Sequence, residues 1–151
     1  MSGTQPRQSV AAVQLCAVAT SISPIVYAVV MLVMASQGAL PFGPEALIEP
    51  GLVKPIGTIL LVVGVGVALL SFWARAMLTH QLTEDTDSLQ ARMRITLICM
   101  AISNTPAIFG LVLALMAGLS VYVWTTWGIS LAANVYHFPT RAWLETRNDN
   151  Q

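Results

Sequence analysis

Two histidines, His80 and His137, are the residues in this sequence best suited to ligate a cofactor. Each stands near the end of an apolar stretch, and two imidazoles on facing helices can bind the iron of a b-type haem. The competing interpretation is that both flank helix ends and face outward, toward lipid headgroups. We favour the second interpretation, because Pro139 follows His137 closely and His80 lies beyond Arg75 in a polar stretch. We therefore expect no resident cofactor and no metal site.

Other catalytic patterns are missing from the sequence. It has no Cys-x-x-Cys pair, no Glu-x-x-His pair and no glycine-rich phosphate loop. A Ser-His-Asp arrangement would lack a base within the apolar stretches. We therefore expect that the protein is not an enzyme and has no catalytic residues.

Two prolines inside apolar stretches suggest a polar bend. Pro24 and Pro106 have no N–H, so each leaves a carbonyl four residues earlier, on Thr20 or Ile102, without its helical donor. Neighbouring polar side chains can pair with those carbonyls or hold a water molecule. These side chains are Ser21, Ser23, Ser103, Asn104 and Thr105. We weigh a small polar binding site at the membrane midplane against a compensated kink without a ligand, and favour the kink.

The elements that carry these residues are long and apolar. Only 14 of the 151 residues are charged, or 9%, whereas a soluble protein has roughly 25%. Hydrophobic residues make up 56%, and the mean hydropathy is +0.71. This composition indicates an integral membrane protein and excludes a disordered chain or a soluble enzyme. The net charge of zero, without a basic stripe, argues against a nucleic-acid partner.

Four stretches are long enough to predict helices that cross a lipid bilayer. A bilayer core about 30 Å thick needs roughly 20 apolar residues in a helix. The predicted spans are residues 10–34, 55–78, 95–118 and 121–138, of which the fourth is the shortest. Together they predict an all-α, integral membrane four-helix bundle in a single membrane domain, residues 1–151.

The basic residues predict the orientation of this bundle. Lys54 is alone on one side of the predicted spans. Six arginines lie on the other side: Arg7, Arg75, Arg92, Arg94, Arg141 and Arg147. Basic residues are enriched in cytoplasmic segments. We therefore expect a multi-pass protein of the cytoplasmic (inner) membrane with both termini in the cytoplasm.

The sequence also contains an internal repeat. Residues 21–30 match residues 103–112, which lie 82 positions later, and residues 72–78 match residues 138–144, which lie 66 positions later. The two matches occur in the same order, so they favour two tandem helical hairpins, residues 10–78 and 92–144. The two hairpins would have the same orientation in the membrane.

Small residues at helical spacing predict where helices meet. Gly64 and Ala68 form one short stripe, and Gly110, Ala114 and Gly118 form another. Such stripes let the backbones of neighbouring helices approach closely in a membrane. They are equally compatible with contacts inside the bundle and with contacts between subunits of an oligomer.

Residues 57–118 resemble the helical hairpin of rotary ATPase subunit c, the proteolipid. The resemblance rests on the glycines of Val63-Gly64-Val65-Gly66-Val67, on Ala74-Arg75, on the polar loop that follows, and on Ile108-Phe109-Gly110-Leu111-Val112-Leu113-Ala114. The duplicated length is similar to that of the vacuolar-type proteolipid. In that family a carboxylate that carries the ion lies a few residues before the equivalent of Ile108-Phe109-Gly110. Here Asn104 occupies the aligned position. The resemblance implies a proteolipid-like scaffold. Because an asparagine cannot titrate, the scaffold lacks the ion-carrying carboxylate, which argues against rotary proton transport.

These patterns favour a non-catalytic structural or accessory subunit of a membrane complex, of a kind found in bacteria. Its expected partners are the lipid bilayer and either further copies of itself, in a homo-oligomer, or other membrane subunits. Two alternatives remain open. One is a haem-binding membrane anchor of a redox complex, with haem b at His80 and His137. The other is a small channel or transporter that uses the bend at residues 103–106.

Overall fold

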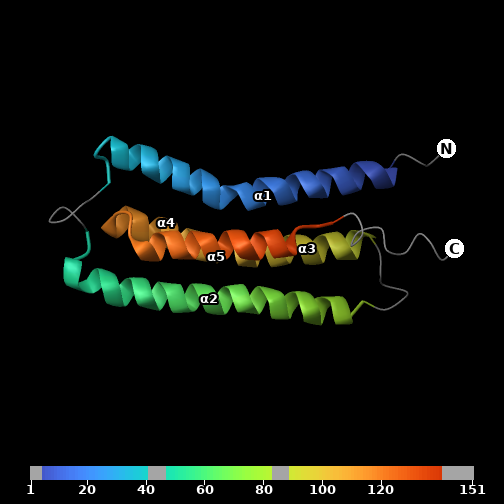
Figure 1. Ribbon diagram of the computed structural model, residues 1–151. Helices are drawn as coiled ribbons and strands as arrows, with labels where there is room; N and C mark the ends of the chain where they lie inside the picture. Colours follow the sequence, from blue (N-terminus) through green and yellow to red (C-terminus); the bar gives the residue numbers. More distant parts are fainter. Residues whose placement is uncertain (1–4, 41–46, 83–88, 141–151) are drawn as a thin grey trace.

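The computed structural model describes residues 5–40, 47–82 and 89–140, and every regular element in these ranges is helical. The helices are α1 (Gln5–Ser36), α2 (Pro50–His80), α3 (Leu89–Ser103), α4 (Thr105–Ala117) and α5 (Val121–His137). α3 and α4 are consecutive halves of one rod, interrupted at Asn104 (Figure 1). The bundle therefore consists of four packed helices, which confirms the predicted all-α class and the number of helices.

Three of these helices are long and apolar enough to cross a membrane. The candidate segments are Gln14–Ser36, Gly51–His80 and, across the interruption, Gln90–Ala117. They overlap the first three predicted spans. α5 has 17 residues, which corresponds to a length of about 25 Å at 1.5 Å per residue. The fourth predicted span is thus a helix, and it is shorter than the other three.

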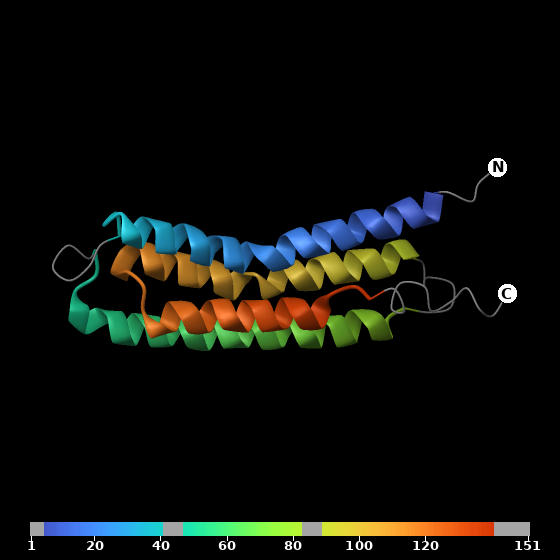
Figure 2. The same cartoon turned by 45° about the horizontal axis from the view of Figure 1, so that its top comes forward.

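The four helices are arranged so that α1 and α2 occupy opposite sides of the bundle. The α3–α4 rod and α5 lie between them in Figure 1, whereas in the turned view of Figure 2 α5 lies in front of α2. α1 packs against the rod and α5 rather than against α2. The first predicted hairpin, residues 10–78, is therefore antiparallel, but its two helices do not pack together. α4 and α5 do form a packed hairpin. α1 and α3 begin at the same end of the bundle at which α2 and α5 terminate (Figure 1).

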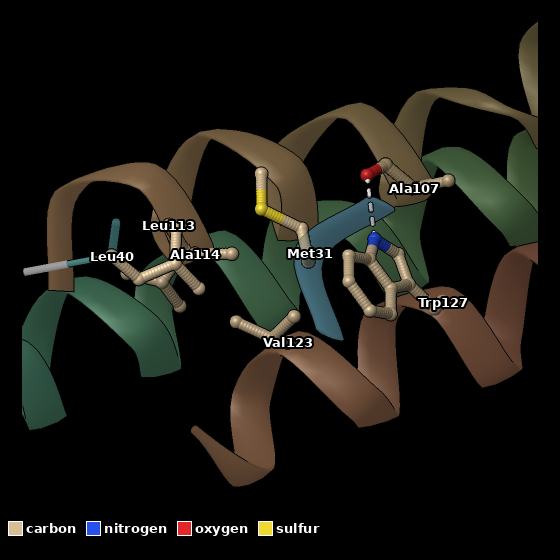
Figure 3. Packing of buried hydrophobic residues seen from close by; sticks show 7 residues of the cluster. All are labelled: Met31, Leu40, Ala107, Leu113, Ala114, Val123 and Trp127. Carbon is tan, nitrogen blue, oxygen red and sulfur yellow. Dashed lines mark hydrogen bonds between the residues drawn. The ribbon is translucent and has the colours of Figure 1, made fainter. Parts of the chain in front are cut away.

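The buried apolar core lies where α4 and α5 meet, near the turn that joins them. Figure 3 shows its members: Met31, Leu40, Ala107, Leu113, Ala114, Val123 and Trp127. The indole Nε1 of Trp127 donates a hydrogen bond to the carbonyl oxygen of Ala107 at 3.0 Å. The turn itself requires Gly118, whose φ of 75° is disfavoured for residues with a side chain.

Both predicted small-residue stripes lie inside the bundle. A Cβ atom on Gly110 would lie 2.8 Å from Nε1 of Trp127 and would also collide with Oγ1 of Thr126. A Cβ atom on Gly64 would lie 3.4 Å from Cβ of Pro106. Ala68, Ala114 and Gly118 are buried as well. The first stripe faces the α3–α4 rod and the second contributes to the contact with α5, so each faces another helix of this chain.

Candidate functional site

The interruption between α3 and α4 exposes backbone groups that a continuous helix would pair. The N–H of Ala107 donates to the carbonyl of Asn104 at 3.0 Å, three residues back, instead of to the carbonyl of Ser103. Ser130 on α5 supplies the missing donor, because its hydroxyl donates to the Ser103 carbonyl at 2.8 Å. One of the carbonyls at the interruption, that of Ser103, is therefore paired by a side chain from a neighbouring helix.

Two asparagines extend this pairing across three helices. Nδ2 of Asn134 on α5 donates to Oδ1 of Asn104 at 2.8 Å, and Oδ1 of Asn134 accepts the hydroxyl of Ser103 at 2.6 Å. Nδ2 of Asn104 donates to the carbonyl of Thr20 on α1 at 3.3 Å. We call these residues the amide network: Thr20, Ser103, Asn104, Ser130 and Asn134. Ser103, Ser130 and Asn134 are completely buried.

The carbonyl of Thr20 is the one that Pro24 deprives of its helical donor. The hydroxyl of Ser23 donates to it at 2.7 Å, in addition to Asn104. α1 continues through Pro24 but is bent in its middle (Figure 1). Ser21 lies in the same turn, and its buried hydroxyl has no hydrogen-bond partner among the described residues. Thr105 is half-buried at the start of α4.

The polar residues of α5 lie on one face of the helix. Thr126, Ser130, Asn134 and His137 are spaced by four, four and three residues and are each at most 1% exposed. Of these four residues the sequence patterns singled out only His137, as a possible haem ligand, and not Thr126, Ser130 or Asn134. Their spacing was the available signal, because residues three and four apart share a helix face.

The structure buries His137 and leaves His80 exposed. The prediction that both histidines face outward is wrong for His137, which has no exposed surface. His80 lies at the end of α2, about 13 Å further along the helix axis than Ser71, the residue that His137 contacts. The two candidate haem ligands are therefore not brought together. Among the described residues, no three His, Cys, Asp or Glu side chains are grouped in a way that could hold a metal ion.

Both ring nitrogens of His137 contact side chains of α2. Nε2 lies 2.9 Å from the hydroxyl oxygen of Ser71, and Nδ1 lies 3.3 Å from Nη1 of Arg75. Arg75 also donates to the carbonyl of Tyr136 at 3.0 Å, and its guanidinium carbon lies 5.5 Å from the centre of the Tyr136 ring. The ring of Phe72 packs 5.0 Å from the imidazole. We call these residues the His137 cluster: Ser71, Phe72, Arg75, Tyr136 and His137.

The two polar clusters differ in the chemistry that they allow. The amide network contains only neutral donors and acceptors, so it can join helices but cannot gain or lose charge. The His137 cluster combines a titratable imidazole with a permanent cation. Comparisons of this chain with protein-family models, with curated proteins and with solved structures found no match.

Proposed function

We propose that this protein is a non-catalytic structural or accessory subunit of a membrane complex, with all four helices crossing the cytoplasmic membrane. The charges of α2 support this placement. Lys54 and Arg75 are 21 residues apart, or about 31 Å along the helix, with no charge between them. This distance matches a hydrocarbon core of about 30 Å. Broad aliphatic surfaces on α1 and α2 face outward, as lipid contact requires; examples are Val29, Val62 and Leu69.

The proposed orientation has both termini in the cytoplasm. Arg75, Arg92 and Arg94 lie at the end of the bundle where α1 begins and α5 ends, and Lys54 lies at the opposite end. This distribution agrees with the enrichment of basic residues on the cytoplasmic side. Arg141 and Arg147, which contributed to the prediction, lie outside the described residues.

The observation that best supports a structural role is that the residues of the amide network form their hydrogen bonds with one another. Asn104 and Asn134 use their amide groups on each other, on Ser103 and on Thr20. A channel or transporter needs polar groups that exchange partners with water or an ion. Here the donors and acceptors hold α1, the α3–α4 rod and α5 together, which supports a scaffold over the transport alternative. The separation of His80 from His137 argues likewise against a haem-binding anchor.

A proteolipid-like scaffold with an internal duplication is part of this proposal. α2 packs against the α3–α4 rod where Gly64 meets Pro106, within the segment that resembles subunit c. Asn104, at the aligned position of the ion carrier, is used for joining helices. The duplication gains support from α2 and α5, which run parallel and contact each other through Ser71 and His137, 66 positions apart. Residues 141–144 of that match lie outside the described residues.

Cross-linking in intact membranes followed by native mass spectrometry tests the subunit role. The probe is a photo-cross-linking amino acid, which does not need a lysine or a carboxylate on the partner. Placed at Val62, on the exposed face of α2, it should give an adduct heavier than the 16.2 kDa chain. The same probe at the buried Ala114 is the control and should give none. A protein that stays monomeric in the membrane with probes on each exposed helix face would contradict the proposal.

A further inference from the structure

The hydrogen bonds around His137 fix the protonation state that this cluster accepts. A guanidinium can only donate, so Nδ1 of His137 must accept from Arg75 and carries no proton. The proton of the neutral ring is therefore on Nε2, which donates to the hydroxyl of Ser71. That hydroxyl in turn donates to the carbonyl of Ala68 at 2.6 Å. Each of these three hydrogen bonds has one donor and one acceptor only when the imidazole of His137 is neutral.

The surroundings of His137 provide no negative charge among the described side chains. From α2 it faces the cation of Arg75 and the ring of Phe72, and on α5 it neighbours the ring of Tyr136. On α3 the titratable groups are Arg92, Arg94 and the buried thiol of Cys99, which feels the Arg75 charge. α4 carries no titratable side chain, and the titratable groups described on α1 are the exposed Cys16 and the half-buried Tyr27. A proton added to the ring would thus meet a like charge 3.3 Å away.

We propose that the contact between α2 and α5 at His137 is a pH-sensitive switch in which protonation of the imidazole separates the ends of the two helices. A proton on Nδ1 turns this atom from an acceptor into a donor, so the hydrogen bond from Arg75 is lost. The protonated imidazole of the buried His137 and the guanidinium of the half-buried Arg75 then repel each other. The stability that this contact contributes is present in neutral and alkaline solution and is lost as the pH falls.

The switch acts at a defined place. The residues of α5 that belong to the amide network and the apolar core precede His137, so they keep the earlier turns of the helix in position while its C-terminal end moves. The residues freed by this motion belong to the end of the bundle at which α2 and α5 terminate. The structure thus assigns a local rearrangement to acid, rather than unfolding of the whole bundle.

Distances between spin labels on the full chain in lipid nanodiscs test this proposal. One pair uses Met77→Cys and Val135→Cys, which are exposed positions beside the His137 cluster, in a background of Cys16→Ser and Cys99→Ala. The control pair uses Ile59→Cys and Trp124→Cys, exposed positions at the far end of α2 and α5. Between about pH 8 and about pH 4 the first distance should lengthen and broaden reversibly, and the control distance should stay constant.

His137→Gln separates the proposed cause from a general effect of acid. The glutamine amide can accept from Arg75 and donate to Ser71 but does not titrate, so the first distance should become independent of pH. The proposal would be overturned if the first distance still changed with pH in this variant. It would also be overturned if that distance did not change with pH in the protein that retains His137. If this variant does not fold, nitrogen-15 spectra of the two histidines provide the test, with the exposed His80 as the internal reference. A proton on Nδ1 of His137 at neutral pH would equally refute it.

Discussion

Nδ2 of Asn104 donates a hydrogen bond to the carbonyl of Thr20, the backbone group that Pro24 leaves without a helical donor. A defect in one helix is thus compensated by the interrupted turn of another. The Ser23 hydroxyl on α1 already donates to the same carbonyl at 2.7 Å, so the bond from Asn104, at 3.3 Å, adds a link between α1 and the α3–α4 rod. Asn104 therefore contacts both α1 and α5 from the interruption of the rod.

Asn104→Asp tests the direction of this hydrogen bond. An ionised aspartate would place an anionic oxygen against the Thr20 carbonyl, whereas a protonated one could donate to it as the amide does. Stability should thus be close to that of the parent in acid and should fall as the pH rises. The loss should approach the roughly 2.5–3.5 kcal/mol that a charge costs at the centre of a membrane helix. Melting temperatures in detergent at several pH values measure it.

The matched control for that substitution is Asn104→Thr, which cannot ionise. It should lower the melting temperature by the same amount at every pH. An aspartate variant whose melting temperature does not depend on pH would show that the side chain at this position faces water rather than Thr20.

The pairing of Asn134 with Asn104 predicts energetic coupling between the two residues. Asn134→Ala should destabilise the fold by about 1–2 kcal/mol, because it leaves buried polar groups on Ser103 and Asn104 with poorer partners. The double variant Asn104→Ala, Asn134→Ala should cost less than the two single changes added together. Strict additivity in this double-mutant cycle would mean that the two amides do not interact.

The glycines offer a matched comparison of buried and open positions. Gly110→Ala places a methyl group against Thr126 and Trp127, so it should cost about 1–3 kcal/mol of stability through overpacking. Gly66→Ala adds the same group where nothing lies within 4 Å. It should be neutral or stabilise by up to about 1 kcal/mol through helix propensity. Thermal unfolding in one detergent ranks the two, and the reverse order would place Gly110 on the outside.

The orientation of the bundle can be measured by labelling intact cells. Gln37→Cys and Gln81→Cys introduce thiols at exposed positions beyond opposite ends of the helices, in a Cys16→Ser background. A membrane-impermeant maleimide applied from outside should modify the first thiol and leave the second unmodified until the cells are opened. Modification of the second thiol alone would reverse the topology.

Local rules were sufficient to predict several features of this structure. Proline chemistry predicted that Thr20 and the turn before Pro106 would need polar compensation, and Ser23 and Asn104 are among the residues that provide it. Length and apolar character predicted all four helices. These inferences need only the residues of one segment, so tertiary context does not change them.

Features that depend on two distant segments could not be predicted in the same way. The polar contacts of the buried His137 come from Ser71 and Arg75 on another helix, and no sequence pattern around these two residues indicates that they contact a histidine. The separation of α1 from α2 depends on how α5 fits between them. The aliphatic residues of α1 are similar around most of its circumference, so no pattern indicates which side meets a neighbour.

The short length of α5 has a consequence for the surrounding lipid. Its roughly 25 Å falls about 5 Å short of an ordinary hydrocarbon core, whereas α2 beside it exceeds that thickness. If α5 crosses the membrane as proposed, acyl chains next to it must compress or tilt, and this hydrophobic mismatch costs fractions of a kcal/mol for each ångström. The protein would then deform the lipid on its α5 side and on its α2 side unequally.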